Sequence, residues 1–170
     1  MKLNNIRSNE EGFTLLELLI VIVIIAILAA IVFVALDPAT RFADARDARR
    51  ATDVVEVLHG IKIDQVDNGG DYLTSIEALT DGTVYMIGTA ASGCDDDNTS
   101  CDTNVTADTD CVDLTGLVTE GYIGKVPISP AGDVTWDATT TGYTLTVNAN
   151  GTARFASCES ENTTEITFVR

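Results

Sequence analysis

The sequence predicts an α+β protein in which a long N-terminal helix packs against a small antiparallel β-sheet head. The helix is membrane-spanning in its first half and interrupted by a proline, and disulfides staple the head. Three observations predict this fold. Nineteen residues without charge, amide or hydroxyl run from Leu18 to Leu36. A helix-forming stretch with an apolar stripe follows them, and the remainder combines short β-prone segments, turn residues and four cysteines.

Length and charge exclude several classes of protein. The chain has 170 residues, enough for one ordinary domain with an appendage. Its 26 acids against 10 bases give a net charge of −16, and a polyanion is repelled by phosphate backbones, so no nucleic-acid partner is expected. Residues 1–50 hold six acids and six bases, so all the net charge lies in residues 51–170.

The apolar stretch has the length of a membrane span. At about 1.5 Å per residue it forms a helix roughly 28 Å long, close to the thickness of a bilayer's hydrocarbon core. A cleaved secretory signal peptide is the alternative. Its apolar region is usually shorter, and here the small residues Ala26, Ala29 and Ala30 lie within the stretch and not beyond it. We therefore expect a retained transmembrane helix over residues 13–36.

Glu17 is the one acid embedded in this apolar segment. A carboxylate in lipid costs about 2.5–3.5 kcal/mol and usually has a partner. No lysine or arginine is fewer than ten residues away. Cleavage between Gly12 and Phe13 would create an α-ammonium group one helical turn before Glu17. That group could pair with Glu17 of the same chain or of a neighbouring copy.

The residues Gly-Phe-Thr-Leu-Leu-Glu-Leu-Leu, from Gly12 to Leu19, closely resemble the N-terminal signature of type IV prepilins and type II secretion pseudopilins. The resemblance implies that residues 1–12 are a leader peptide, cut by a prepilin peptidase after Gly12, and that Phe13 becomes N-methylated. It also implies that Glu17 neutralises the terminal amine of an adjacent subunit during assembly. Gly121–Gly132 is similar to a further pilin segment, with Ser129 where an aspartate is often found.

The same resemblance implies where the protein resides and with what it assembles. The subunit would wait as a single-pass protein of the inner membrane and would then be drawn into a helical homo-oligomeric filament by an inner-membrane assembly platform. The filament would be extracellular or periplasmic. The resemblance does not choose between a surface pilus, a secretion pseudopilus and a competence fibre, or between a major and a minor subunit.

Residues 37–68 are expected to continue the helix as an amphipathic segment. Asp37-Pro38 is a helix start signal, and Asn68-Gly69-Gly70 supplies a C-terminal stop. The apolar stripe predicted to face the head comprises Phe42, Ala51, Val54, Leu58 and Ile61. For the charges of Arg41–Arg50 we expect a solvated helix face. The alternative is contact with acids of neighbouring subunits.

Residues 69–170 form the acidic α+β head, with β-prone segments at Thr83–Gly88, Tyr143–Cys158 and Ile166–Val169. A three-residue hairpin loop over residues 149–151 sets Val147 opposite Ala153 and Leu145 opposite Phe155, which produces one apolar face.

Residues 93–113 are expected to be a surface loop, because they contain seven aspartates, three cysteines and almost no large apolar residue. Four cysteines without metal-ligand spacing predict two disulfides in an exported chain. Three pairings are open, of which we favour Cys94–Cys101 with Cys111–Cys158.

The acidic loop raises two further hypotheses. Calcium prefers oxygen ligands, and the candidates are Asp95, Asp97, Asp102 and Asp110. A solvated acidic surface is the preferred interpretation, since no calcium-loop pattern is present. Glycosylation sequons begin at Asn98 and Asn104, and both have an aspartate two residues earlier; Asn150 and Asn162 begin two others.

No enzymatic activity and no catalytic residue are predicted. The only histidine is His59, on the long helix, and the chain has no nucleophile elbow or phosphate loop. The sequence therefore favours a structural subunit, a pilin or pseudopilin, without a cofactor unless calcium binds. The alternative is a monomeric membrane-anchored extracytoplasmic binding module with a cation-binding acidic loop.

Overall fold

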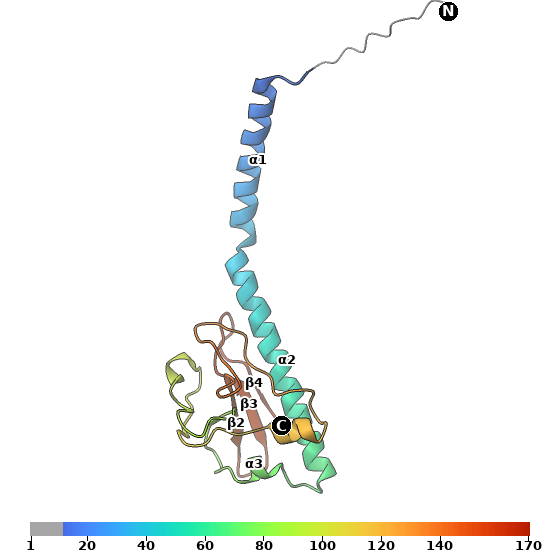
Figure 1. Ribbon diagram of the computed structural model, residues 1–170, viewed down its shortest axis with the longest axis vertical. Coiled ribbons are helices and arrows are strands. Elements are labelled where there is room, and N and C mark those ends of the chain that lie inside the picture. The colour runs from blue at the N-terminus through green and yellow to red at the C-terminus, as the bar shows by residue number, and fades with distance from the viewer. Residues whose placement is uncertain (1–11) are drawn as a thin grey trace, which may run out of the picture. The chain divides into compact units, whose positions relative to one another are not determined.

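The structure is a computed structural model that describes residues 12–170 (Figure 1). The expected leader peptide therefore lies outside the described residues, except for Gly12. The chain divides into two compact units, with the boundary between Arg41 and Phe42.

The first unit is built on helix α1 (Leu15–Leu36), which is apolar on every side and has no buried residue. The helix ends at Asp37, whose backbone adopts a left-handed conformation with φ 35°. Aspartate tolerates this conformation better than most residues, and the following Pro38 suits the first position of a helix. The predicted interruption at Asp37-Pro38 is confirmed.

The second unit combines helix α2 (Pro38–Asp67), from Phe42 onward, with a four-stranded antiparallel sheet in the order β1-β2-β3-β4 (Figure 1). The strands are β1 (Tyr85–Met86), β2 (Tyr143–Val147), β3 (Ala153–Ser157) and β4 (Thr167–Val169). Helix α3 (Thr74–Glu77) lies between α2 and β1, and the short helices η1 (Asn98–Ser100) and α4 (Thr115–Thr119) lie between β1 and β2. The α+β class with a helix packed on an antiparallel sheet is confirmed.

The apolar stripe of α2 makes the main core together with the sheet. Val54, Leu58 and Ile61 are buried, as predicted, and pack in one cluster with side chains of β2 and β3. Phe42 is 65% exposed, so its assignment to the stripe is wrong. At 3.6 residues per turn, position 42 lies about a third of a turn away from Val54, and the smaller Ala43 is buried instead.

The predicted hairpin joins β2 and β3. Val147 pairs with Ala153 and Leu145 with Phe155, which confirms the register. Gly151 has φ 75°, the left-handed conformation that such a three-residue loop requires.

The loop over residues 93–113 is more than a solvated surface. Its side chains Cys94, Val105 and Cys111 are buried in a second apolar cluster with Met86 and Trp136. Small apolar side chains suffice here, because the disulfides and the single tryptophan fill the space. The expectation of a surface loop holds for most of its residues, but it did not include these buried side chains.

The structure pairs Cys94 with Cys111 and Cys101 with Cys158, so the favoured pairing was wrong. The loop folds back on itself, and Cys94 N donates to Asp108 O at 3.2 Å, which brings its two ends together. Asp102 N donates to Cys158 O at 2.6 Å and so places Cys101 beside Cys158. Chain reversal decides this pairing, and sequence spacing does not reveal it.

Two phenylalanines opposite each other on β3 and β4 provide a matched test of the core. Phe155 is fully buried against Tyr143, whereas Phe168 is 44% exposed. Phe155→Ala should lower the free energy of unfolding by about 3–5 kcal/mol through lost burial and a cavity. Phe168→Ala should cost less than half as much. Urea denaturation of both variants measures this, and equal losses would contradict the proposed core.

Candidate functional site

Two polar regions within residues 12–170 bear on function: the N-terminal end of α1, and a buried ionic network between α2 and the C-terminal part of the head. At the first, Thr14 and Glu17 form a reciprocal capping box. Thr14 N and Thr14 Oγ1 donate to Glu17 Oε2 at 2.9 and 2.8 Å, and Glu17 N donates to Thr14 Oγ1 at 3.2 Å. Glu17 therefore has partners in its own chain, which sequence analysis missed although Thr-x-x-Glu is the pattern of a capping box.

Gly12 and Phe13 precede the helix. Both are exposed and neither is part of a helix or strand. Backbone groups within a helix are hydrogen-bonded to one another. A peptide bond outside the helix is therefore more accessible to a peptidase than one within it. The expected cleavage position lies in such a segment, two residues before α1 begins.

The surface of α1 is suited to an apolar environment. The helix is long and apolar enough to cross a membrane, by length and composition. A helix that is apolar all round is normally buried in protein or in lipid. One side of α1 bears a shallow apolar groove lined by Ile25, Leu28, Ala29, Val32 and Phe33.

Comparison with protein families identifies this N-terminal segment. A family model described as the prokaryotic N-terminal methylation motif matches residues 7–33. The chain carries the N-methylation motif typical of type IV pilins and pseudopilins. The matched range includes Gly12, Phe13 and Glu17, and it confirms the resemblance seen in the sequence. Pilin-like proteins are generally structural and non-enzymatic. Comparison with curated proteins and with solved structures gave no match.

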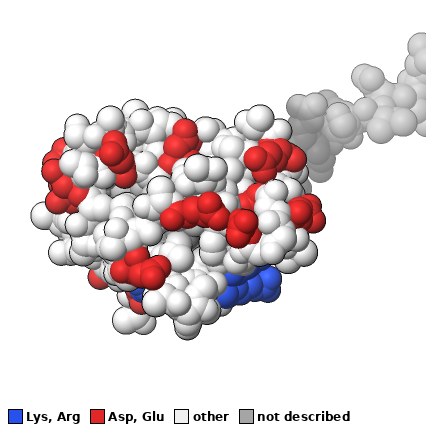
Figure 2. Space-filling view, turned by 90° about the horizontal axis from the view of Figure 1, so that it is seen from below, with Lys and Arg blue, Asp and Glu red and all other residues white. Residues whose placement is uncertain are grey.

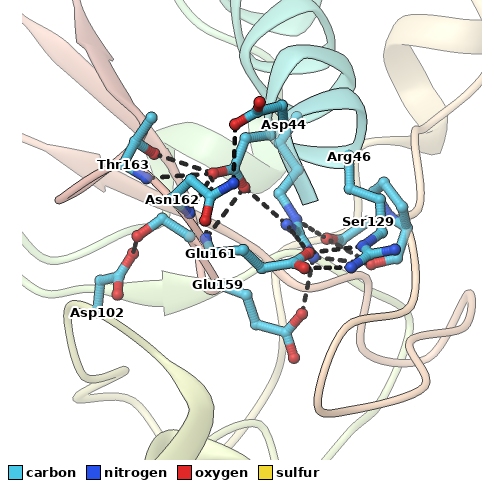
Figure 3. A network of polar contacts seen from close by, with 12 residues as sticks. Asp44, Arg46, Asp102, Ser129, Glu159, Glu161, Asn162 and Thr163 are labelled. Atoms are coloured by element: carbon cyan, nitrogen blue, oxygen red, sulfur yellow. Dashed lines mark hydrogen bonds and ion pairs between the residues drawn. The ribbon is translucent and has the colours of Figure 1, made fainter. Parts of the chain in front are cut away.

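The second polar region is centred on Arg50 of α2, and Figure 3 shows Ser129, Glu159 and Glu161 within this network. The side chain of Arg50 is fully buried. Its guanidinium donates to Asp47 Oδ1 at 2.9 Å, Ser129 Oγ at 3.1 Å, Pro130 O at 3.0 Å, Glu159 Oε2 at 2.9 Å and Glu161 Oε1 at 2.7 Å. A buried guanidinium is tolerated only where carboxylates and further acceptors surround it, and both are present here.

Asp47 is the acceptor for three successive backbone groups of the C-terminal part of the chain. The amides of Glu161, Asn162 and Thr163 donate to its carboxylate at 2.9–3.3 Å. Burial favours the protonated form, but these backbone hydrogen bonds and the one from Arg50 hold the pKa of Asp47 below its usual value.

Arg46, one turn before Arg50 in α2, is also part of the network. Its Nε donates to Glu161 Oε1 at 2.7 Å, and its Nη2 contacts Glu161 Oε2. The hydrogen bond from Arg46, followed by that from Arg50, lowers the pKa of Glu161 to about 2. Arg46 and Arg50 thus bind acids of their own chain. The predicted solvated face is wrong for Arg50, which is fully buried, whereas Arg46 is half-buried. Contact of this basic segment with acids of neighbouring subunits stays a prediction.

The calcium candidates are not gathered into one site. Within residues 12–170, no group of three or more histidine, cysteine, aspartate or glutamate side chains could hold a metal ion. Asp102 accepts a hydrogen bond from Ser160 Oγ at 2.6 Å, and burial raises its pKa. Asp95 lies beside Asp108, and a hydrogen bond between the two carboxyl groups raises the pKa of Asp95. Asp97 precedes η1, and Asp110 has a left-handed backbone with φ 61°.

The two favoured sequons differ in environment. Asn98 is half-buried, and both polar atoms of its amide bond the backbone of Val105, at 2.7 and 2.9 Å. Asn104 is exposed. His59 is also exposed on α2. Glycosylation at either asparagine stays a prediction.

Adjacent arginines of α2 provide a matched test of the network. Arg50→Ala should destabilise the head by about 3–5 kcal/mol, because it leaves the buried carboxylates of Asp47 and Glu159 without their ion pair and removes one of the two arginines that bind Glu161. Arg49 is exposed and lies 3.8 Å from Asp53, so Arg49→Ala should cost less than about 1 kcal/mol. Thermal and urea unfolding would show the difference. A small loss for Arg50→Ala would mean that the network contributes little.

The lowered pKa values predict the effect of acid. A carboxylate whose pKa is lower in the folded chain than in the unfolded chain stabilises the fold above its unfolded pKa. For Glu161 this contribution is present above about pH 4.5 and is lost as pH falls toward 2. The free energy of unfolding should fall over this window, and Glu161→Gln should make the fall shallower. Urea titrations at several pH values measure both slopes; identical slopes would refute the assignment.

Proposed function

We propose that the protein is a structural subunit, a pilin or pseudopilin, that polymerises into a type IV pilus-like or type II secretion pseudopilus filament. The observation that carries this proposal is helix α1 with its methylation motif: the helix has 22 residues, is apolar on every side and has no buried residue. Exposed apolar area costs about 25 cal/mol per Å² in water, so such a helix requires lipid or other helices around it.

In this proposal, each of four segments has a separate role. Residues 1–12 are the leader that a prepilin peptidase removes, and residues 13–36 span the inner membrane and later form the filament core. Residues 37–68 connect the core to the head, and residues 69–170 form the head. An inner-membrane assembly platform moves the subunit from the membrane into the filament, which is extracellular or periplasmic.

Close helix packing in the filament core is supported by small side chains on α1. Ala26 and Ala30 are four residues apart and so lie on one side of the helix, where they allow another helix to approach closely. The groove beside Ala29, between Ile25 and Phe33, offers a complementary depression for an apolar side chain of a second copy.

Glu17 fits a role in which it exchanges partners. In the single chain Glu17 Oε2 accepts two hydrogen bonds from Thr14. The capping box thus supplies hydrogen-bond donors to the carboxylate while it lies in lipid. Cleavage after Gly12 supplies an α-ammonium group at Phe13. An ammonium from a neighbouring copy then pairs with a carboxylate that Thr14 already holds in place.

The head's charge suits exposure to water on the filament surface. Acidic side chains spread over the face of the head in Figure 2, with one basic patch at its edge. A net charge far from zero keeps heads soluble and apart, so association is left to the apolar helices.

The test is Glu17→Ala with Glu77→Ala as control, since Glu77 is an exposed acid of the head. Glu17→Ala should abolish filaments, because the terminal ammonium loses its partner in an apolar core, while membrane insertion and head folding persist. Glu77→Ala should leave filaments intact. Electron microscopy of shed filaments, with the mature N-terminus read by mass spectrometry, measures both.

Two results would refute the proposal: a mature chain that begins at Met1, or filaments that form normally with Glu17→Ala. A membrane-bound monomer that never forms filaments would favour the alternative, an anchored extracytoplasmic binding module. Retention of ⁴⁵Ca²⁺ by the wild-type chain would add the cation-binding loop to that alternative.

A further inference from the structure

The disulfide Cys101–Cys158 lies at the start of the segment that covers Arg50. We call residues 159–163 the docking segment. Cys158 directly precedes it, and Asp102, next to Cys101, donates its amide to Cys158 O at 2.6 Å. Ser160 Oγ donates to Asp102 Oδ2 at 2.6 Å. One covalent bond and two hydrogen bonds therefore fix the N-terminal half of the docking segment to the cysteine-rich loop.

The docking segment is bound to α2 on its other side. Glu159 and Glu161 accept hydrogen bonds from Arg50, and the amides of residues 161–163 converge on Asp47 (Figure 3). The acids that neutralise Arg50 thus come from the same helix turn and from this segment. If the segment were displaced, Arg50 would keep only Asp47 as an ionic partner and would have to be hydrated.

We propose that Cys101–Cys158 is a redox latch, whose closure locks the docking segment onto Arg46, Asp47 and Arg50. Closure removes two electrons and two protons from the thiols of Cys101 and Cys158 and forms their S–S bond. A disulfide oxidant takes up those electrons and protons and becomes two thiols. The helix α2 and the sheet pack in either state, but the head is locked to α2 only in an oxidising compartment.

The second disulfide serves as a built-in control. Cys94–Cys111 joins residues that are 17 positions apart and is packed in the apolar cluster around Trp136. The backbone groups of its two cysteines bond Asp108 and Ala90, which belong to the same part of the head. Cys101 lies between these two cysteines, so removal of Cys94–Cys111 should loosen the loop around it. The bond Cys101–Cys158 and the hydrogen bonds to Asp47 persist in that variant, so the docking segment should stay on α2.

Amide hydrogen exchange of the full chain in detergent micelles tests the latch directly, because the amides of residues 161–163 are the donors to Asp47. In C101S/C158S these amides should exchange at least about tenfold faster than in wild type, and the amides of β2 and β3 should not change. In C94S/C111S the docking segment should keep its protection.

Three results would overturn the proposal: unchanged protection of residues 161–163 in C101S/C158S, equal loss in both double variants, or loss that spreads to β2 and β3. This readout needs no filament, so it is independent of the proposed function.

The coupling must also operate in reverse, and a chain with intact disulfides shows it. Asp47→Ala removes the acceptor of the three amides, so dithiothreitol should reduce Cys101–Cys158 at least about threefold faster than in wild type. Reduction of Cys94–Cys111 should not change. Differential alkylation followed by peptide mass spectrometry measures both rates. Equal acceleration of the two disulfides, or none, would contradict the latch.

Discussion

The constraint on which the rest depends is that α1 is apolar on every side and that none of its residues is buried. Exposure of so much apolar surface to water is unfavourable. In the proposed function, lipid surrounds this helix first, and copies of the same helix surround it later. The remainder of the chain is then under a different requirement: it must form a head that folds without any help from α1. The two compact units, divided at Arg41, reflect this separation.

The head is held on α2 by two different kinds of contact, one apolar and one ionic. Toward its C-terminal end, α2 packs through Val54, Leu58 and Ile61, an apolar contact that tolerates small shifts in position. One turn before Val54, Arg50 makes directional hydrogen bonds to acceptors from three parts of the chain. Apolar burial provides most of the stability, whereas the buried guanidinium admits only one arrangement of its partners. The ionic network is therefore better suited to fixing the position of the head on the helix than to stabilising it.

The elements that could be predicted from the sequence are those decided by neighbours along the chain. Helix α2, its stop after Asp67 and the register of the β2–β3 hairpin all follow from periodicity or from turn residues, and each was predicted. The burial of Arg50 could not be predicted from the sequence. Its partners Glu159 and Glu161 are more than a hundred residues away, and in the sequence they resemble any other surface acids. The disulfide pairing failed for the same reason: it depends on where the loop reverses. The capping box of Thr14 and Glu17 is different, since its local pattern was visible and only its meaning was overlooked.

That capping box changes the energetic problem at the N-terminus. A carboxylate without hydrogen-bond partners in lipid would raise the free energy of the unassembled subunit in the membrane. Assembly would then be favoured mainly because it removes this cost. Because two donors of Thr14 bind one oxygen of Glu17, the carboxylate has hydrogen-bond partners without a neighbouring subunit. A charged hydrogen bond is nonetheless stronger when the donor is an ammonium group. In the proposed function, exchange of the Thr14 donors for an ammonium donor of a neighbouring copy would therefore favour the filament. Before assembly, the two hydrogen bonds from Thr14 would stabilise the carboxylate of Glu17.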